Sequence, residues 1–111
     1  MTTYVCLINW TEQGIKGFRD TVRRAENFSE LVRGAGGTVR ELWWTVGEYD
    51  IVQVVEFPDE ETGVAALLEL ESGGNIRART MQAFNAAQMA TIIERASIRR
   101  EYRRSEAWSA G

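Results

Sequence analysis

Polar and aromatic side chains that could do chemistry are concentrated in a few short stretches of the chain. Asn9 and Trp10 end the first apolar run, and Tyr49 and Asp50 follow a glycine near the middle. An aspartate or a tyrosine can transfer a proton, and an asparagine amide or an arginine can stabilise a carbonyl or enolate oxygen. We therefore predict Asp50, Tyr49 and Asn9 as catalytic candidates. The candidate ligand-binding residues are Trp10, Trp43, Trp44, Asn75 and Arg77.

The composition excludes several common kinds of active site. The chain has no histidine, which removes Ser-His-Asp and Cys-His nucleophiles, histidine-rich zinc sites and histidine-ligated haem in their usual forms. Cys6 is the only cysteine, so no internal disulfide or CxxC motif can form, and its apolar neighbours indicate a buried structural thiol. The carboxylates near the middle of the chain lack the loop spacing of a metal site. We therefore predict no metal and no cofactor.

Charge and hydropathy give expectations about partners. The net charge of -3 favours solubility and argues against nucleic acid. The arginine-rich stretch 95–104 is interrupted by Glu101, which favours a solvated helix with Glu–Arg pairs over a nucleic-acid patch. Tyr102 and Trp108 could instead pack this tail on a neighbouring subunit. The first ten residues have no charged leader and no long apolar run, so we expect a cytoplasmic protein without membrane contact.

Hydrophobic periodicity predicts alternating strands and helices. Runs of β-formers predict strands over residues 3–10, 38–46, 49–57 and 76–84. Apolar residues at helical spacing predict helices over residues 12–34 and 60–72, and a last helix from residue 86 into the arginine-rich tail. Thr11, Asp59 and Asn85 are the expected N-caps. Gly14 and Gly17 weaken the first helix, which we expect to begin late or to pack its backbone closely.

The second and third predicted strands are joined by Gly47 and Glu48. A two-residue loop with glycine first is typical of a type II′ hairpin, and this register places Trp44 opposite Ile51. Adjacent strand residues point to opposite faces, so Trp43 and Trp44 cannot form one aromatic box.

The predicted element order is β-α-β-β-α-β followed by a helix, which is the ferredoxin-like α+β arrangement. Right-handed crossovers then place the strands in the order 4-1-3-2, all antiparallel, with both helices on one face. The first and third strands are apolar on both faces, so the second face needs another layer. A second copy would supply it as a dimeric α+β barrel, which we favour over cover by the C-terminal helix. We expect one domain over residues 1–96 and a helical extension over 97–111.

Three segments carry a resemblance to a known family. They are TYVCLINWTEQGIKG, WWTVGEYDIVQVVEFPDEET and GGNIRARTMQAF, and together they resemble the GYD domain family over roughly residues 3–95. The glycine-x-tyrosine-aspartate signature of that family reads Gly47, Tyr49 and Asp50 here. The resemblance implies a ferredoxin-like fold and self-association, and it implies no established reaction.

The predicted topology brings six of the candidate residues to one pole of the sheet, namely Asn9, Trp10, Tyr49, Asp50, Asn75 and Arg77. Two hypotheses follow. The first is a small-molecule-binding barrel that could act as a cofactor-independent oxygenase or cyclase on an aromatic or enolisable substrate, by analogy with other dimeric α+β barrels. The second is a non-catalytic oligomeric assembly or regulatory module. In that case the tryptophans would pack in the core or an interface, and Tyr49 and Asp50 would satisfy hairpin backbone groups and pair with Arg77.

Overall fold

The computed structural model describes residues 1–106, with side chains described for residues 1–96. Nine elements follow one another along the chain. They are β1 (Thr2–Trp10), α1 (Glu12–Lys16), the 3₁₀ turn η1 (Phe18–Asp20), α2 (Thr21–Gly34), β2 (Thr38–Trp44), β3 (Ile51–Phe57), α3 (Glu60–Ser72), β4 (Ile76–Ala83) and α4 (Ala86–Glu106).

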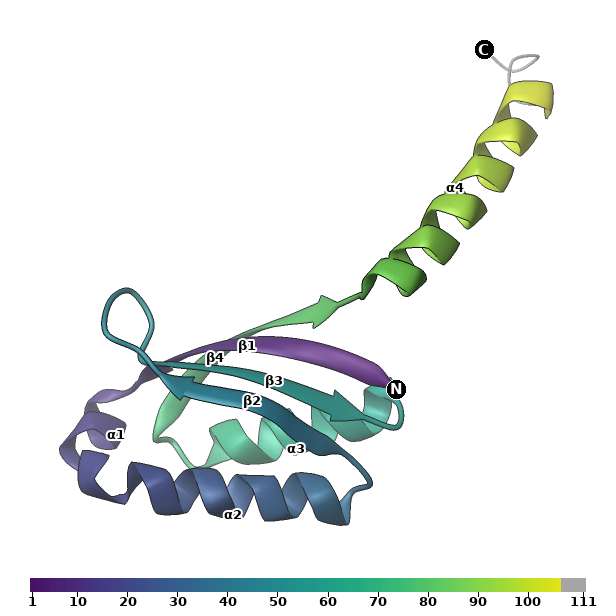
Figure 1. The fold of residues 1–111 in the computed structure, drawn as a ribbon. Helices are drawn as coiled ribbons and strands as arrows, with labels where there is room; N and C mark the ends of the chain where they lie inside the picture. The colour runs from purple at the N-terminus through teal and green to yellow at the C-terminus, as the bar shows by residue number, and fades with distance from the viewer. Residues whose placement is uncertain (107–111) are drawn as a thin grey trace.

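The four strands form one antiparallel sheet in the order β2-β3-β1-β4, as predicted. Helices α2 and α3 cover one face of this sheet (Figure 1). Alternate residues of the two central strands point toward these helices and are buried, because side chains alternate across a strand. The core lies between the sheet and the helices, and its members include Tyr4, Cys6, Ile8, Phe28, Val32, Val55, Phe57, Ala66 and Leu67.

The long helix predicted over residues 12–34 is divided into α1, η1 and α2. Thr11 caps α1 by accepting a hydrogen bond from the Gly14 N–H (3.0 Å). The chain leaves helical geometry at Gly17, one of the two glycines expected to weaken this segment. Gly14 is buried, and a Cβ there would collide with the Asn75 carbonyl oxygen. The close packing expected at Gly14 is therefore present, against the loop that precedes β4.

The connection between β2 and β3 is wider than the predicted two-residue turn. Trp44 does lie opposite Ile51, but residues 45–50 form a loop. Gly47 has a φ of +149°, in the region that favours glycine, with no neighbouring atom within 4 Å of its Cβ position. The Thr45 N–H donates to the Asp50 carbonyl (2.8 Å) at the base of this loop, and the Asp50 N–H donates to the Ile8 carbonyl of β1 (2.9 Å).

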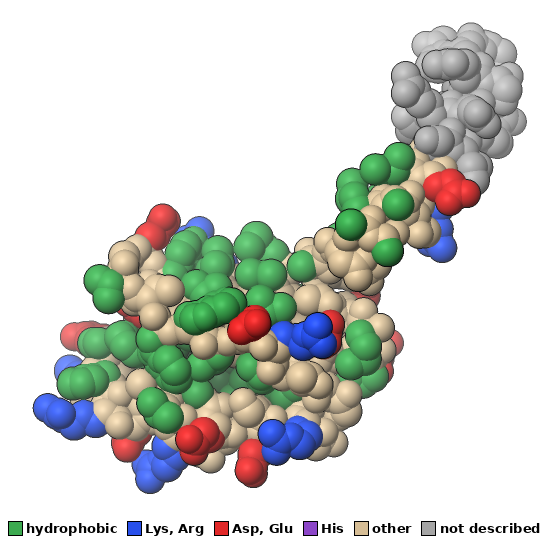
Figure 2. Space-filling model, viewed as in Figure 1, with side chains coloured by type: hydrophobic (Ala, Val, Ile, Leu, Met, Phe, Trp, Pro, Cys, Tyr) green, Lys and Arg blue, Asp and Glu red, His purple; other side chains and the backbone are tan. Residues whose placement is uncertain are grey.

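The second face of the sheet is not covered by any element of the same chain that the structure describes. α4 follows β4 and projects away from the sheet, so the molecule extends to 62 × 29 × 23 Å (Figure 1). Cover by the C-terminal helix, the less favoured prediction, is therefore not observed. Figure 2 shows hydrophobic side chains gathered over this uncovered side. We call it the open face and define it by Val5, Leu7, Trp43, Val52, Val54 and Met81.

Candidate functional site

The Gly47-Glu48-Tyr49-Asp50 segment is held to the end of β1 by hydrogen bonds. The Asp50 carboxylate accepts from the Trp10 backbone N–H (2.9 Å) and from the Asn9 Nδ2 (3.3 Å). Asn9 Nδ2 also donates to the Glu48 carbonyl (2.9 Å). Sequence reasoning expected Asn9, Trp10 and Asp50 to lie at one pole, and the structure places them in contact. The contacts fasten the β2–β3 loop to the central strand.

A second loop, at residues 73–75, is fastened to the start of α1 at the same pole. The Thr11 N–H donates to the Asn75 carbonyl (3.1 Å) and the Thr11 hydroxyl to the Gly74 carbonyl (2.6 Å). Gln13 Nε2 donates to Asn75 Oδ1 (3.0 Å). These bonds hold Asn75, a predicted ligand-binding residue, at the edge of the helix-covered side of the sheet.

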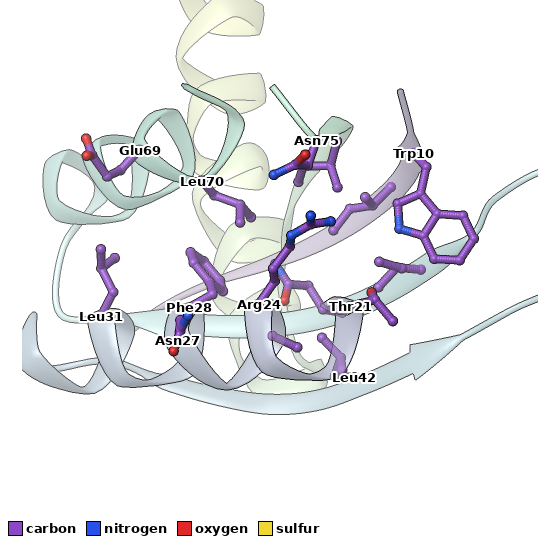
Figure 3. A pocket seen from close by; sticks show the side chains of 15 residues that line it. Trp10, Thr21, Arg24, Asn27, Phe28, Leu31, Leu42, Glu69, Leu70 and Asn75 are labelled. Atoms are coloured by element: carbon purple, nitrogen blue, oxygen red, sulfur yellow. The ribbon is translucent and has the colours of Figure 1, made fainter. Parts of the chain in front are cut away.

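A cavity of about 270 Å³ opens between α2, the C-terminal part of α3 and the helix-covered side of the sheet (Figure 3). Two of the predicted ligand-binding residues, Trp10 and Asn75, line it. Most of its wall is apolar. The remaining lining residues are Ile8, Thr21, Arg24, Ala25, Asn27, Phe28, Leu31, Leu42, Ile51, Gln53, Glu69, Leu70 and Ile76.

Sequence reasoning missed five polar residues that line this cavity, namely Thr21, Arg24, Asn27, Gln53 and Glu69. Two of them, Arg24 and Gln53, occupy positions that face the core. Gln53 is only 1% exposed, although it occupies an inward position of β3 that an aliphatic residue would ordinarily fill. Arg24 lies one helical turn before the buried Phe28 on α2, so its side chain starts on the sheet-facing side. Both could have been found as polar residues at apolar positions of an otherwise regular pattern.

The two adjacent tryptophans lie on opposite sides of the sheet, as predicted. Trp44 is on the helix side, and its indole N–H donates to the Thr21 hydroxyl at the start of α2 (2.9 Å). Trp43 lies on the open face opposite Val52 and is 50% exposed. Neither tryptophan lines the cavity of Figure 3.

Arg77 and Tyr49 lie near the same pole without joining the Asp50 contacts. Arg77 is exposed on β4, opposite Asn9 in the strand pairing. In residues 1–96 the salt bridges join Arg23 to Asp20 and Arg40 to Glu56, so the suggested Asp50–Arg77 pair is not formed. The Tyr49 backbone carbonyl accepts from the Thr45 hydroxyl, which closes the base of the loop.

Cys6 is a fully buried thiol beneath the cavity-lining layer. Burial raises the pKa of the Cys6 thiol, and the nearby Thr80 and Gln53 side chains partly offset that effect. A neutral, inaccessible thiol is a poor nucleophile, which agrees with the structural role expected from the sequence.

No group of three or more histidine, cysteine, aspartate or glutamate side chains in the described residues could hold a metal ion. None of the helices described there combines the length and apolar character needed to cross a bilayer.

Comparison with known proteins places this architecture in a family. The family model of the GYD domain matches residues 4–93. The chain belongs to the GYD domain family. The glycine, tyrosine and aspartate of the GYD signature are thus the residues of the loop that is fastened to β1. The match ends early in α4, so most of that helix lies outside the matched residues.

Two similar proteins come from Thermus thermophilus. One is named glutamine synthetase and cystathionine beta-lyase binding protein, and it is 32% identical over 90 residues, covering 80% of this chain and 95% of the relative. The other is TTHA0845, whose crystal structure matches with a TM-score of 0.50 at 24% identity, over 78% of this chain and 96% of that chain. The structural match supports the fold assigned to this GYD chain.

Proposed function

We propose that this GYD chain is a non-catalytic assembly module that self-associates through its open face and binds other proteins as a dimer. The open face carries this proposal. Its centre is formed by Val5, Leu7, Val52 and Val54, four apolar residues side by side on the two central strands. Trp43 and Met81, each 50% exposed, extend it onto both edge strands. An apolar surface that spans a whole sheet is typical of an interface.

The charges at the edges of the open face favour a second copy of the same chain as the occupant. Arg79 lies on β4 beside Leu7, and Glu41 lies on β2 beside Val54, so opposite charges border opposite edges. A two-fold axis along the strands would bring β4 of one copy over β2 of the other. Arg79 would then lie over Trp43 and two residues along from Glu41 of the other copy, a distance that its long side chain can span. The same pair would form twice around an apolar centre, as a two-fold interface requires.

The name of the Thermus thermophilus relative supports binding to enzymes. That protein is named for binding glutamine synthetase and cystathionine beta-lyase. We extend this role to the present chain and propose enzymes of these two kinds as its partners. Packing of two open faces leaves α2, α3 and α4 of each copy available for such contacts.

Light scattering coupled to size-exclusion chromatography tests the dimer. The wild-type chain is expected to elute with a dimer mass, whereas Val54→Lys should be a folded monomer, because a charge at the centre of the face would be desolvated. Val64→Lys is the matched control, since Val64 is 49% exposed on α3. A monomeric wild type, or a dimeric Val54→Lys variant, would overturn the proposal.

Biolayer interferometry tests the enzyme partners directly. The chain is immobilised, and purified glutamine synthetase and cystathionine beta-lyase from the same organism are passed over it. Saturable binding of at least one of the two enzymes supports the proposed partner role. If neither enzyme binds, that role is ruled out.

A second candidate function is a cofactor-independent enzyme acting on an aromatic or enolisable substrate. The observation that favours it is the link between the cavity and the signature loop, because Trp10 lines the cavity and its backbone N–H contacts Asp50. In this candidate Asp50 or Tyr49 transfers the proton and Asn9 stabilises the developing oxyanion.

Oxygen uptake and absorbance would be followed with polycyclic phenols and 1,3-diketones as substrates. The Tyr49→Phe variant should be slower, and absence of wild-type turnover would eliminate the candidate.

A further inference from the structure

A glutamine side chain is buried on the helix-covered side of the sheet with a hydrogen-bond donor left over. Gln53 lies between Cys6 and Leu42 in the strand pairing and is 1% exposed. By distance and angle its Nε2 has no hydrogen-bond partner among the described residues, and the neighbouring Cys6 sulfur is only a weak acceptor for it. Burying a donor without a strong acceptor is unfavourable, whereas an apolar side chain of the same shape would avoid that cost. The amide is therefore unfavourably placed in the free protein, and because its Nε2 is inaccessible there, it would have to turn toward the cavity to meet an acceptor that enters.

Gln53 lines the 270 Å³ cavity, and Arg24 lines it from the opposite wall. Figure 3 shows the Arg24 side chain reaching from α2 toward Asn75. Its Nη2 lies 2.6 Å from the Cβ position of Gly17, so a side chain at residue 17 would displace the guanidinium. In the part of the chain with described side chains, Arg24 forms no salt bridge. A cation held at a cavity without a carboxylate partner favours an anionic ligand.

The remaining polar groups of the cavity agree with this preference. Asn75 Oδ1 already accepts from Gln13, so the NH₂ of Asn75 is the part of its amide left to bind a ligand. Glu69 is exposed, and its carboxylate points away from the cavity (Figure 3). The groups presented to a ligand are therefore mainly donors.

The apolar part of the wall describes the rest of the ligand. The Trp10 indole, the Phe28 ring and several aliphatic side chains surround the donors. A volume of 270 Å³ is near the lower end of the range for small-molecule sites, about 300–1,000 Å³. A compact aromatic or branched aliphatic group would fit such a wall.

We propose that this cavity binds a small organic carboxylate with an apolar body. The carboxylate accepts hydrogen bonds from Arg24 and Gln53, and the body packs against Trp10 and Phe28. The site lies on the side of the sheet opposite the open face, so the inference goes beyond self-association. The proposal requires only that the carboxylate binds; it does not require that the protein converts it.

Isothermal titration calorimetry with phenylacetate and indole-3-acetate tests this site, with phenylacetamide as the uncharged probe. Wild-type protein is expected to bind both carboxylates saturably. Arg24→Gln should weaken phenylacetate binding about tenfold or more, because the charge-assisted bond is lost, and change phenylacetamide binding less than about twofold. The neighbouring Arg23→Gln is the matched control, because Arg23 is exposed and pairs with Asp20. Equal phenylacetate binding by wild type and Arg24→Gln would overturn the proposal, as would no binding of either carboxylate.

Gln53→Met supplies a second, independent test. Methionine has nearly the shape of glutamine without its donor, so the variant should melt at the same or a higher temperature while binding phenylacetate more weakly. A lower melting temperature would mean that the amide stabilises the free protein and would contradict the argument. The Val54→Lys variant separates the two proposals, because it should lose dimerisation and keep carboxylate binding.

Discussion

At the scale of single residues, the acidic residue of the GYD signature acts as a hydrogen-bond acceptor for the backbone. β1 ends at Trp10, whose N–H is satisfied by the Asp50 carboxylate instead of by a neighbouring strand. The same carboxylate orients the Asn9 amide. A short acidic side chain at this position therefore ties the loop to the central strand.

Asp50→Ala is expected to destabilise the protein by about 1–3 kcal/mol, because it leaves the Trp10 N–H and the Asn9 amide without their acceptor. Urea unfolding followed by circular dichroism measures the change. Glu48→Ala is the control, since only the backbone carbonyl of Glu48 takes part in these contacts. Equal stability of Asp50→Ala and wild type would mean that the carboxylate is available for chemistry.

At the scale of elements, the distance between α3 and the sheet is set by a glycine. Gly63 is buried in α3, and a Cβ there would lie 2.7 Å from Tyr4 Cε2 and 2.9 Å from Phe57 Cδ2. These rings belong to the two central strands and pack against each other with centroids 6.3 Å apart. The helix can approach the sheet this closely only because residue 63 has no side chain.

Gly63→Ala should therefore lower the free energy of unfolding by about 1–3 kcal/mol, since the two buried rings would have to shift. Gly34→Ala is the matched control, because Gly34 ends α2 and has no atom within 4 Å of its Cβ position. The free energy of unfolding of Gly34→Ala should be unchanged or higher by up to about 1 kcal/mol. Equal destabilisation by both substitutions would show that close packing at Gly63 is not the cause.

At the scale of the whole molecule, the sheet domain and the end of α4 are expected to be energetically separate. α4 projects from β4 without covering the sheet, and the GYD domain match ends at residue 93. Its apolar residues Met89 and Ile92 are 47% and 37% exposed. The boundary expected at residue 96 stays a prediction.

A chain shortened to residues 1–96 should unfold within about 0.5 kcal/mol of the full chain at equal concentration, because the core of the described residues is built from residues between Tyr4 and Ala78. Urea unfolding of both chains measures this. A loss above about 1 kcal/mol would mean that residues 97–111 pack on the assembled protein, as Tyr102 and Trp108 would allow.

The sequence alone determined the family, the strand order and the pole at which Asn9, Trp10 and Asp50 meet. The family follows from the resemblance of three segments, whereas the strand order and the pole follow from local patterns, such as alternation, caps and glycine turns, together with the handedness of crossovers. The pairing of Trp44 with Ile51 followed for the same reason, and with it the separation of Trp43 from Trp44.

Only the tertiary structure decided which polar groups share a cavity. The wide loop over residues 45–50, the break at Gly17 and the burial of Gln53 beside Arg24 depend on contacts between elements far apart in the chain. From local periodicity alone, Gln53 is only one polar residue in an otherwise apolar strand. The packing of α2 and α3 on the sheet places it in the wall of the same cavity as Arg24, because a cavity depends on how elements pack together and not on any one of them.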